Sequence, residues 1–172
     1  MPYDDLRKGR WSERGRAYFV TTVLADRPSR RFADFWCARD VIAEMRALHD
    51  ADAVSSLAWV VMPDHVHWLF QLVGDLSLST VMKQFKGRSA RRVNARLGLA
   101  GPLWQRAFYD HGIRADEDIQ QVARYIVANP LRAGLVERVG DYPHWDAVWV
   151  QASGTTGRCE LVGATEVAPT CG

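Results

Sequence analysis

Cysteine is scarce in this chain, and its few thiols have no spacing that indicates a function. The 172 residues include three cysteines, Cys37, Cys159 and Cys171, with neither a C-x-x-C pair nor the spacing of a Cys/His metal site. An odd number of widely separated thiols does not form the disulfide framework of a small secreted domain. We expect ordinary thiols in a reducing cytoplasm.

Long apolar runs and a large net charge are also missing. No apolar run approaches the ~18 residues that a membrane helix needs. The N-terminus does not place an apolar segment after a positive one, as a secretory signal does. The formal net charge is only +2, so partners must be inferred from where the charges lie. With a hydrophobic content of 48%, these absences predict a cytoplasmic protein with one globular domain and no membrane partner.

The chain divides into three parts by composition. Residues 1–16 contain five Lys or Arg without a regular apolar period, which is typical of a basic N-terminal arm. Arg10 and Arg14 of this arm are candidate contacts to an anionic partner, and a solvated tail without a partner is the alternative. Residues 17–150 contain the apolar patterns of the globular domain. Residues 151–172 are rich in small and polar residues and indicate a flexible tail.

Acidic residues are absent between Asp75 and Asp110, although this stretch contains seven Lys or Arg. Its first half has the apolar period of a helix, which the serines of residues 74–79 can cap. An exposed helix that serves only solubility usually mixes the two signs of charge, so this one favours nucleic-acid phosphate as a partner. A solvated basic face is the alternative. The candidate DNA contacts are Lys83, Lys86, Arg88, Arg91, Arg92 and Arg96.

The segment Leu57–Leu72 predicts a β-hairpin, because two apolar runs flank a turn-forming Pro-Asp pair. Since side chains alternate along a strand, His65 and His67 share one face of its second strand. Residues 17–24 predict a further strand, and residues 34–50 predict a helix whose role is to pack on the core.

Two imidazoles on one strand face can share a divalent metal ion. The His65-x-His67 pattern is weak by itself, and a pair without a metal stays open at this point. A dinuclear zinc hydrolase of the H-x-H-x-D-H type is excluded, because Leu69 and Phe70 stand where the acid and the next histidine belong. Ligand softness alone favours zinc or another metal that prefers imidazole.

A second helix with functional side chains is predicted to start at residues 116–118, whose carboxylates suit an N-cap and a first turn. Pro130 ends it at Asn129. Gln121 and Tyr125 precede Asn129 at intervals of four residues, so the three form one polar stripe beside the apolar one.

Two further polar residues, His111 and Arg114, lie in an aromatic-rich segment before that helix. Both are candidates to reach a site, although a hydrogen-bonded structural histidine is the favoured interpretation of His111.

Three blocks resemble a known family in their order and spacing. They are VVMPDHVHWLF, WQRAFYDHGIR and YIVANPLRAGLV, and they resemble the REP-associated tyrosine transposases, a branch of the HUH superfamily of single-strand DNA transposases with one catalytic tyrosine. The opening strand YFVTTVLADR is similar to that branch as well, so the resemblance covers residues 17–145. The basic arm departs from the family, because RKGRWSERGR matches a G-x-x-R-R-like element only loosely.

The resemblance implies an α/β (α+β) ferredoxin-like fold, in which helices pack on an antiparallel sheet and the H-x-H motif lies on a central strand. By motif, Tyr125 is the expected nucleophile. His65, His67 and Asn129 are the expected ligands of Mg²⁺ or Mn²⁺. Three polar residues are candidates for a supporting role in this site: Gln121, His111 and Arg114.

The implied function is a metal-dependent transposase and endonuclease that nicks and rejoins single-stranded DNA near hairpins of repetitive extragenic palindromes, through a 5′-phosphotyrosine intermediate. The alternative is a domesticated relative that holds hairpins without catalysis. A plain α/β interaction domain is a third interpretation, and it leaves the acid-free basic helix unexplained. The presence of all four site residues favours the enzyme. A monomer and a homodimer both remain open.

Overall fold

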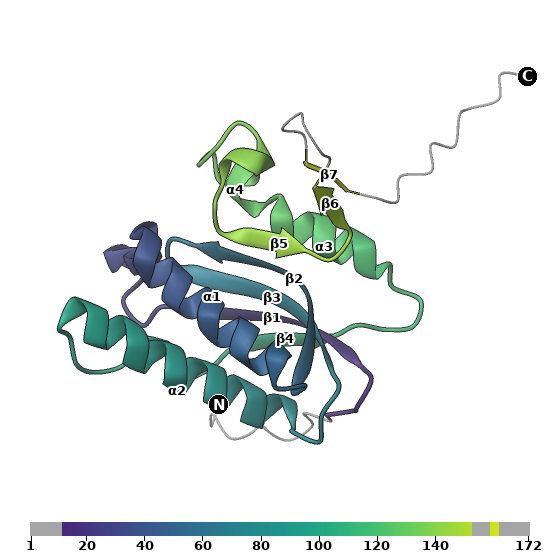
Figure 1. Ribbon diagram of the computed structural model, residues 1–172, viewed down its shortest axis with the longest axis horizontal. Coiled ribbons are helices and arrows are strands. Elements are labelled where there is room, and N and C mark those ends of the chain that lie inside the picture. Colours follow the sequence, from purple (N-terminus) through teal and green to yellow (C-terminus); the bar gives the residue numbers. More distant parts are fainter. Residues whose placement is uncertain (1–11, 153–158, 162–172) are drawn as a thin grey trace, which may run out of the picture.

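A five-stranded antiparallel sheet is the centre of the fold. The computed structural model of the protein describes residues 12–152 and 159–161. The strands of the sheet are β1 (Ala17–Val23), β2 (Val54–Met62), β3 (His65–Leu72), β4 (Tyr109–Gly112) and β5 (Trp145–Ala147). Their order is β4-β1-β3-β2-β5, and all neighbouring strands are antiparallel (Figure 1).

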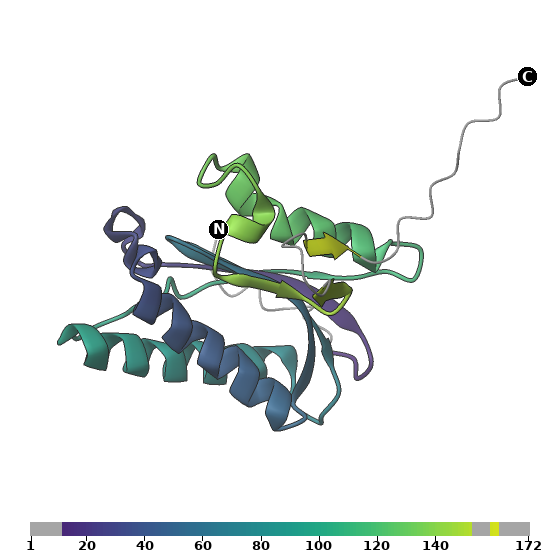
Figure 2. The same ribbon diagram turned by 45° about the horizontal axis from the view of Figure 1, so that its top comes forward.

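Helices cover both faces of this sheet, as Figure 2 shows. On one face lie α1 (Phe35–Asp50) and α2 (Leu78–Leu97). On the other face lie α3 (Ile119–Val127) and α4 (Asn129–Arg132). No helix in the described part of the chain is long and apolar enough to cross a membrane.

Short elements complete the description. The 3-10 turns are η2 (Arg27–Ser29), η3 (Arg31–Ala33) and η4 (Val139–Asp141). A separate two-stranded ladder is formed by β6 (Val150–Ala152) and β7 (Cys159–Leu161). Most of the predicted tail and of the predicted N-terminal arm, including Arg10, lies outside the described residues.

The predicted ferredoxin-like α+β fold is confirmed. Its elements follow one another as β1, α1, β2, β3, α2 and β4. Both helices of this series, α1 and α2, pack on the same face of the sheet. β1 lies between β3 and β4, a strand order that local sequence patterns do not give. The H-x-H strand, β3, is the third of five strands, as predicted.

The alternation along β3 explains why both faces need helices. Trp68 and Phe70 are buried in the core under α1 and α2, whereas Leu69 is buried in a second core under α3. His65 and His67 lie on the same face as Leu69, because side chains two residues apart point the same way. The histidines therefore belong to the face that α3 covers.

Local side chains cap the helix starts, but the prediction that Pro130 ends the tyrosine helix at Asn129 was wrong: α3 ends at Val127, and Pro130 lies in the first turn of α4, where a missing N–H costs nothing. Asp34 caps α1 by accepting a hydrogen bond from the main-chain N–H of Cys37 at 2.8 Å. Ser77 caps α2 by accepting one from Thr80, and Gly98 ends α2 with a φ of 64°, which glycine adopts without strain. Asp118 caps α3, but no acid lies in the first turn of α3, so the prediction of first-turn carboxylates there was wrong.

Ion pairs between α1 and α2 neutralise part of the positive charge that the acid-free sequence places on α2. Arg92 lies 3.0 Å from a Glu44 carboxylate oxygen, and Arg96 donates two hydrogen bonds to Asp40 at 2.5 and 3.1 Å. These acids come from α1, more than forty residues earlier, so a window along the sequence cannot find them. Within the described residues, three cations of α2 make no ion pair: Lys83, Arg88 and Arg91.

Replacing Phe85 by Ala is expected to lower the free energy of unfolding by about 3–5 kcal/mol, the usual cost of deleting a buried aromatic ring. The Phe85 side chain is fully buried, and its ring centroid lies 5.3 Å from that of Trp68 and 5.8 Å from that of Trp104. Urea denaturation measures the change, with Lys83→Ala on the exposed side of α2 as the control. A loss below about 1 kcal/mol for Phe85→Ala would contradict this core.

Candidate active site

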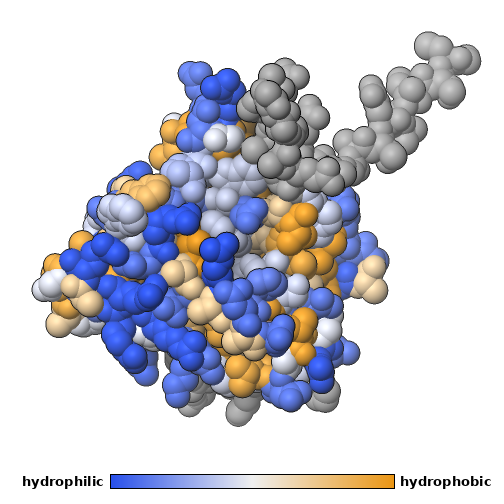
Figure 3. Space-filling view, viewed as in Figure 1, coloured by the Kyte–Doolittle hydropathy of each residue, from blue (hydrophilic) through white to orange (hydrophobic). Residues whose placement is uncertain are grey.

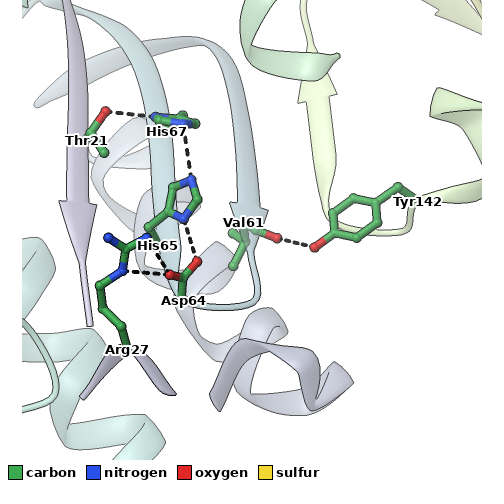
Figure 4. A network of polar contacts seen from close by, with 7 residues as sticks. All are labelled: Thr21, Arg27, Val61, Asp64, His65, His67 and Tyr142. Atoms are coloured by element: carbon green, nitrogen blue, oxygen red, sulfur yellow. Dashed lines mark hydrogen bonds and ion pairs between the residues drawn. The ribbon is translucent and has the colours of Figure 1, made fainter. Parts of the chain in front are cut away.

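The two histidines of the H-x-H motif turn their rings toward each other. The Nε2 atoms of His65 and His67 are 3.2 Å apart, and both side chains are half-buried (Figure 4). Two ligands about 2.1 Å from one ion are about 3 Å apart when they meet at a right angle. The separation therefore fits two ligands of a single divalent ion.

The other ring nitrogens are held by neighbouring side chains. The Nδ1 atom of His67 lies 2.8 Å from the hydroxyl of Thr21, and Nδ1 of His65 lies 2.6 Å from a carboxylate oxygen of Asp64. Arg27 in turn donates a 2.8 Å hydrogen bond to Asp64, as Figure 4 shows. Because a carboxylate only accepts, His65 carries its proton on Nδ1, and Nε2 keeps a lone pair.

The surroundings keep His67 neutral and Asp64 ionised. Burial, together with the neighbouring His65, lowers the pKa of His67 to about 3, so its imidazole is neutral at physiological pH. Burial acts to raise the pKa of Asp64, but hydrogen bonds from His65 and Arg27 outweigh it and hold that pKa below its usual value. Asp64 is therefore ionised at physiological pH and can accept the hydrogen bond from His65.

A third protein ligand must be of another type. Among the residues that the structure describes, no group of three or more His, Cys, Asp or Glu could hold a metal ion. A divalent ion at this point of the sheet would have two imidazole nitrogens as ligands, to which an amide or water oxygen can be added.

Tyr125 lies close to the histidines through one intermediate ring. The ring centroid of Phe19 is 5.4 Å from that of His67 and 6.4 Å from that of Tyr125, which it meets edge-on. The guanidinium of Arg132 lies 4.5 Å from the Tyr125 centroid, on the ring face. Tyr125 is 46% exposed, and its hydroxyl makes no hydrogen bond to any described residue. An aromatic edge and a cation therefore hold the ring, while its oxygen stays accessible.

Asn129 caps the carboxyl end of the tyrosine helix. Its Nδ2 donates to the main-chain oxygens of Tyr125 at 2.9 Å and Ile126 at 3.1 Å. Since carbonyl oxygens cannot donate, the amide nitrogen must face them, and Oδ1 is left for another partner. Tyr125 and Asn129 thus share one end of α3, as their spacing predicted.

A half-buried tyrosine fastens the segment after α4 to the sheet. The Tyr142 hydroxyl donates to the Val61 oxygen at 2.7 Å, and the Val61 N–H donates to the His144 oxygen at 2.8 Å (Figure 4). Burial raises the pKa of Tyr142 to about 12, so this phenol remains a hydrogen-bond donor. These bonds tie the chain after α4 to the end of β2 next to the H-x-H turn.

The predicted supporting residues are accounted for by local contacts. His111 Nε2 lies 2.9 Å from a Glu117 oxygen, and the main-chain N–H of Arg114 donates to the same carboxylate at 3.1 Å. The hydrogen bond from His111 lowers the pKa of Glu117. This agrees with a structural role for His111. Gln121 is exposed, and its main-chain N–H donates to Asp118.

The predicted DNA contacts do not meet the histidines. α2 packs on the face of the sheet opposite to α3 (Figure 2). Within it, Arg92 and Arg96 are paired with α1, and Lys86 donates to main-chain oxygens of Gln105 and Arg106. Arg14, in the arm, lies 3.5 Å from Asp75.

Sequence analysis missed the residues that orient the site, which are Phe19, Thr21, Arg27, Asp64 and Arg132. Alternation along β1 put Phe19 and Thr21 on one face, and that was the only local signal. Their importance depends on the register that sets Thr21 opposite His67, which is a tertiary feature.

The low pKa of His67 makes stability depend on pH. An unfolded histidine takes up a proton below about pH 6.5, whereas folded His67 stays neutral down to about pH 3. The unfolded state therefore binds more protons in this window, and the free energy of unfolding falls as the pH drops through it. His67→Gln is expected to lose less stability than the wild type between about pH 7 and about pH 5, measured by urea denaturation with a chelator present. Equal losses would contradict the neutral buried imidazole.

Comparisons with known proteins agree with this geometry. Residues 16–129 match the family model described as Transposase IS200 like. The REP-associated tyrosine transposase of Escherichia coli (strain K12) is 29% identical over 136 residues, which cover 78% of each chain. A provisionally named REP-associated tyrosine transposase of Haemophilus influenzae is 29% identical over 145 residues, 76% of this chain and 79% of that one.

A solved structure gives the same result for the fold. It is that of a REP-associated tyrosine transposase bound to a REP hairpin, and it superposes with a TM-score of 0.65 at 26% identity over 79% of each chain. The chain therefore belongs to the IS200-like transposase family and is similar to REP-associated tyrosine transposases.

Proposed function

We propose that the protein is a metal-dependent transposase that nicks and rejoins single-stranded DNA next to hairpins, with Tyr125 as its nucleophile. The observation that carries this proposal is the contact series from His67 through Phe19 to Tyr125, in which one aromatic ring separates an exposed tyrosine from two converging imidazoles. The family supports transposase activity in general, and the tyrosine mechanism is the specific form that these residues favour.

The chemistry assigned to Tyr125 is an in-line displacement at a DNA phosphate. Its oxygen forms a new bond to phosphorus while the bond from phosphorus to the 3′-oxygen breaks. The phenol proton passes to water, and the leaving 3′-oxygen takes a proton. The products are a 5′-phosphotyrosine and a free 3′-hydroxyl. Because the linkage keeps the phosphodiester energy, a second 3′-hydroxyl can reverse the step without ATP.

Arg132 has two effects on this nucleophile. A phenol with an ordinary pKa near ~10 is a weak nucleophile at neutral pH, so a nearby positive charge assists it. The guanidinium lies 4.5 Å from the ring centroid, where its charge can attract an incoming phosphate. It also restricts rotation of the ring, which lowers the entropy cost of placing the phenol oxygen in line with the phosphate.

His65, His67 and Asn129 Oδ1 are the proposed ligands of the metal ion. A bound divalent ion supplies positive charge that polarises a phosphate oxygen. Two neutral nitrogens and one amide bind weakly and leave positions for phosphate oxygens, which favours Mg²⁺ or Mn²⁺ over a tightly held zinc. Thr21 and Asp64 fix the ring orientations of the histidines and so prepare the site.

Hairpin DNA is the proposed substrate. The similar solved structure is bound to a REP hairpin, and this chain shares its fold at 26% identity. The cations of α2 outside ion pairs, Lys83, Arg88 and Arg91, are the proposed contacts to its phosphates.

Mutation of the nucleophile is the direct test. Wild-type protein mixed with hairpin-bearing single-stranded oligonucleotides and Mn²⁺ is expected to form a denaturant-resistant protein–DNA adduct, visible on a denaturing gel. Tyr125→Phe is expected to form none, because it lacks the attacking oxygen. The matched control is Tyr109→Phe, since Tyr109 is a 63% exposed tyrosine on the same sheet face.

Two outcomes would count against this assignment. An adduct that persists in Tyr125→Phe would move the nucleophile elsewhere. Hairpin binding by the wild type without an adduct, across many hairpins and both metal ions, would favour a protein that holds hairpins without catalysis.

A second test measures metal affinity directly. Thr21→Val and Asp64→Asn are each expected to weaken Mn²⁺ binding by about 10–100-fold, because the first removes the hydrogen bond that orients His67 and the second removes the negative charge that supports His65. Titration followed by Mn²⁺ electron paramagnetic resonance reports binding without reference to activity. Thr22→Val is the matched control, because its buried hydroxyl has no partner among the described residues and faces the other side of β1. Unchanged affinity in both Thr21→Val and Asp64→Asn would argue against a metal at the histidines.

A further inference from the structure

We propose that a groove between α1 and β5 is a binding site for single-stranded nucleic acid, on the face of the sheet away from Tyr125. This goes beyond the packing role that the sequence predicted for α1. The groove has a volume of about 370 Å³ and is called the α1–β5 groove below. The residues of its lining that carry the argument are Arg39, Ile42, Arg46, His49, Trp59 and Asp146.

Charge is segregated around α1. Its acids Asp40 and Glu44 face α2, where Arg96 and Arg92 pair with them. Its arginines Arg39 and Arg46 face the groove, are exposed, and form no ion pair with any described residue. Two of the three carboxylates of α1 are thus used on the opposite side of the helix, and the third, Asp50, lies four residues after Arg46 and forms no ion pair with any described residue.

The lining of the groove is rich in donors and poor in acceptors. Asp146 is its one carboxylate, and an oxygen of Asp146 already accepts the main-chain N–H of Ala147 at 2.8 Å. Arg39 and Arg46 are seven residues apart, which separates them by about 10 Å along the helix axis. Two cations at that separation suit two phosphates of one strand better than a single small anion.

Aromatic surface lines the same groove. Trp59 is half-buried in the groove, and its indole N–H donates to no described residue. At the start of the same helix stripe, four residues before Arg39, Phe35 is 46% exposed. Bases stack on such rings whatever their sequence, and arginines beside them bind the backbone, which is the usual composition of a single-strand site. An acidic peptide would use the arginines and leave these rings without a partner.

The stripe starts close to the H-x-H turn. The main-chain N–H of Phe32, just before α1, donates to the Pro63 oxygen at 3.0 Å. The Phe35 ring lies 5.2 Å from that of His144, whose main-chain oxygen is bonded to the end of β2. A strand that leaves the histidines and passes around this end of the sheet would meet the start of α1 before it enters the α1–β5 groove. Figure 3 shows this side of the molecule, where hydrophilic surface alternates with smaller apolar areas.

The proposal rests on the proposed function in one respect, because it takes DNA near the histidines as the source of the strand. The groove would hold the single-stranded DNA that flanks a hairpin, while α2 contacts the hairpin itself. Its direct probe is consequently DNA that cannot form a hairpin.

Binding of a labelled oligothymidylate of about 20 nucleotides, followed by fluorescence anisotropy over a range of salt, tests the groove. The double variant Arg39→Ala/Arg46→Ala is expected to bind at least tenfold more weakly. The slope of log K against log[salt] is expected to fall by about 1.4, because each phosphate contact on a single strand contributes ~0.7. The single-charge control for Arg46→Ala is Arg138→Ala, since Arg138 is 82% exposed, lies outside the groove and is already paired with Asp141. Arg138→Ala is expected to bind as the wild type does.

A second measurement uses the wild-type protein, so it does not depend on how a variant folds. Photocrosslinking to an oligothymidylate that carries 5-iododeoxyuridine is expected to label the peptide that contains Trp59. Crosslinks confined to other peptides would overturn the proposal. So would unchanged affinity and salt slope in Arg39→Ala/Arg46→Ala. If poly-L-glutamate of matched charge competes as well as oligothymidylate, the groove takes acidic peptides and the assignment to nucleic acid is wrong.

The adduct assay separates this proposal from the proposed function. Suppose that hairpins form the Tyr125 adduct but that oligothymidylate binds Arg39→Ala/Arg46→Ala as tightly as the wild type. This result would reject the groove and retain the transposase mechanism. A strong effect of both arginines without any adduct would retain the groove and reject the mechanism.

Discussion

The antiparallel pairing of β1 with β3 is the constraint on which the site depends. It sets Thr21 opposite His67 and Phe19 opposite Leu69. The hydroxyl of Thr21 can then orient one imidazole, and the ring of Phe19 can extend from that imidazole to Tyr125. A slip of one residue would turn these side chains to the other face of the sheet. Burial prevents it, because β3 packs against a core on each side.

The two covered faces separate reactive groups from most of the positive charge. The histidines and Tyr125 lie with α3, whereas the cations of α1 and α2 lie across the sheet (Figure 2). A nucleic acid that uses both must pass around an end of the sheet. The turn at Pro63 is such a place, because the loop before α1 is bonded to it and supplies Arg27 to Asp64. The start of α1 and the orientation of His65 are therefore linked through one short loop.

Much of this structure could be predicted from sequence, for physical reasons that differ by element. Strand alternation and a turn-forming pair are local properties, so the hairpin and the shared face of His65 and His67 were predicted correctly. Helix caps such as Asp34 and Ser77 act within three residues, so the starts of α1 and α2 were also accessible. The ferredoxin-like fold came from the resemblance of three sequence blocks and is confirmed by the strand order.

What the sequence alone determined is the local chemistry: two imidazoles on one strand face, and Tyr125 one turn before Asn129 on a separate helix. What only the tertiary structure decided is which groups meet. Thr21 and His67 are 46 residues apart, and Arg96 and Asp40 are 56 apart, so no window along the chain contains either pair. The register of β1 on β3 and the packing of α1 on α2 create them. Those contacts orient the histidines, neutralise part of α2, and leave the arginines of α1 facing their own groove.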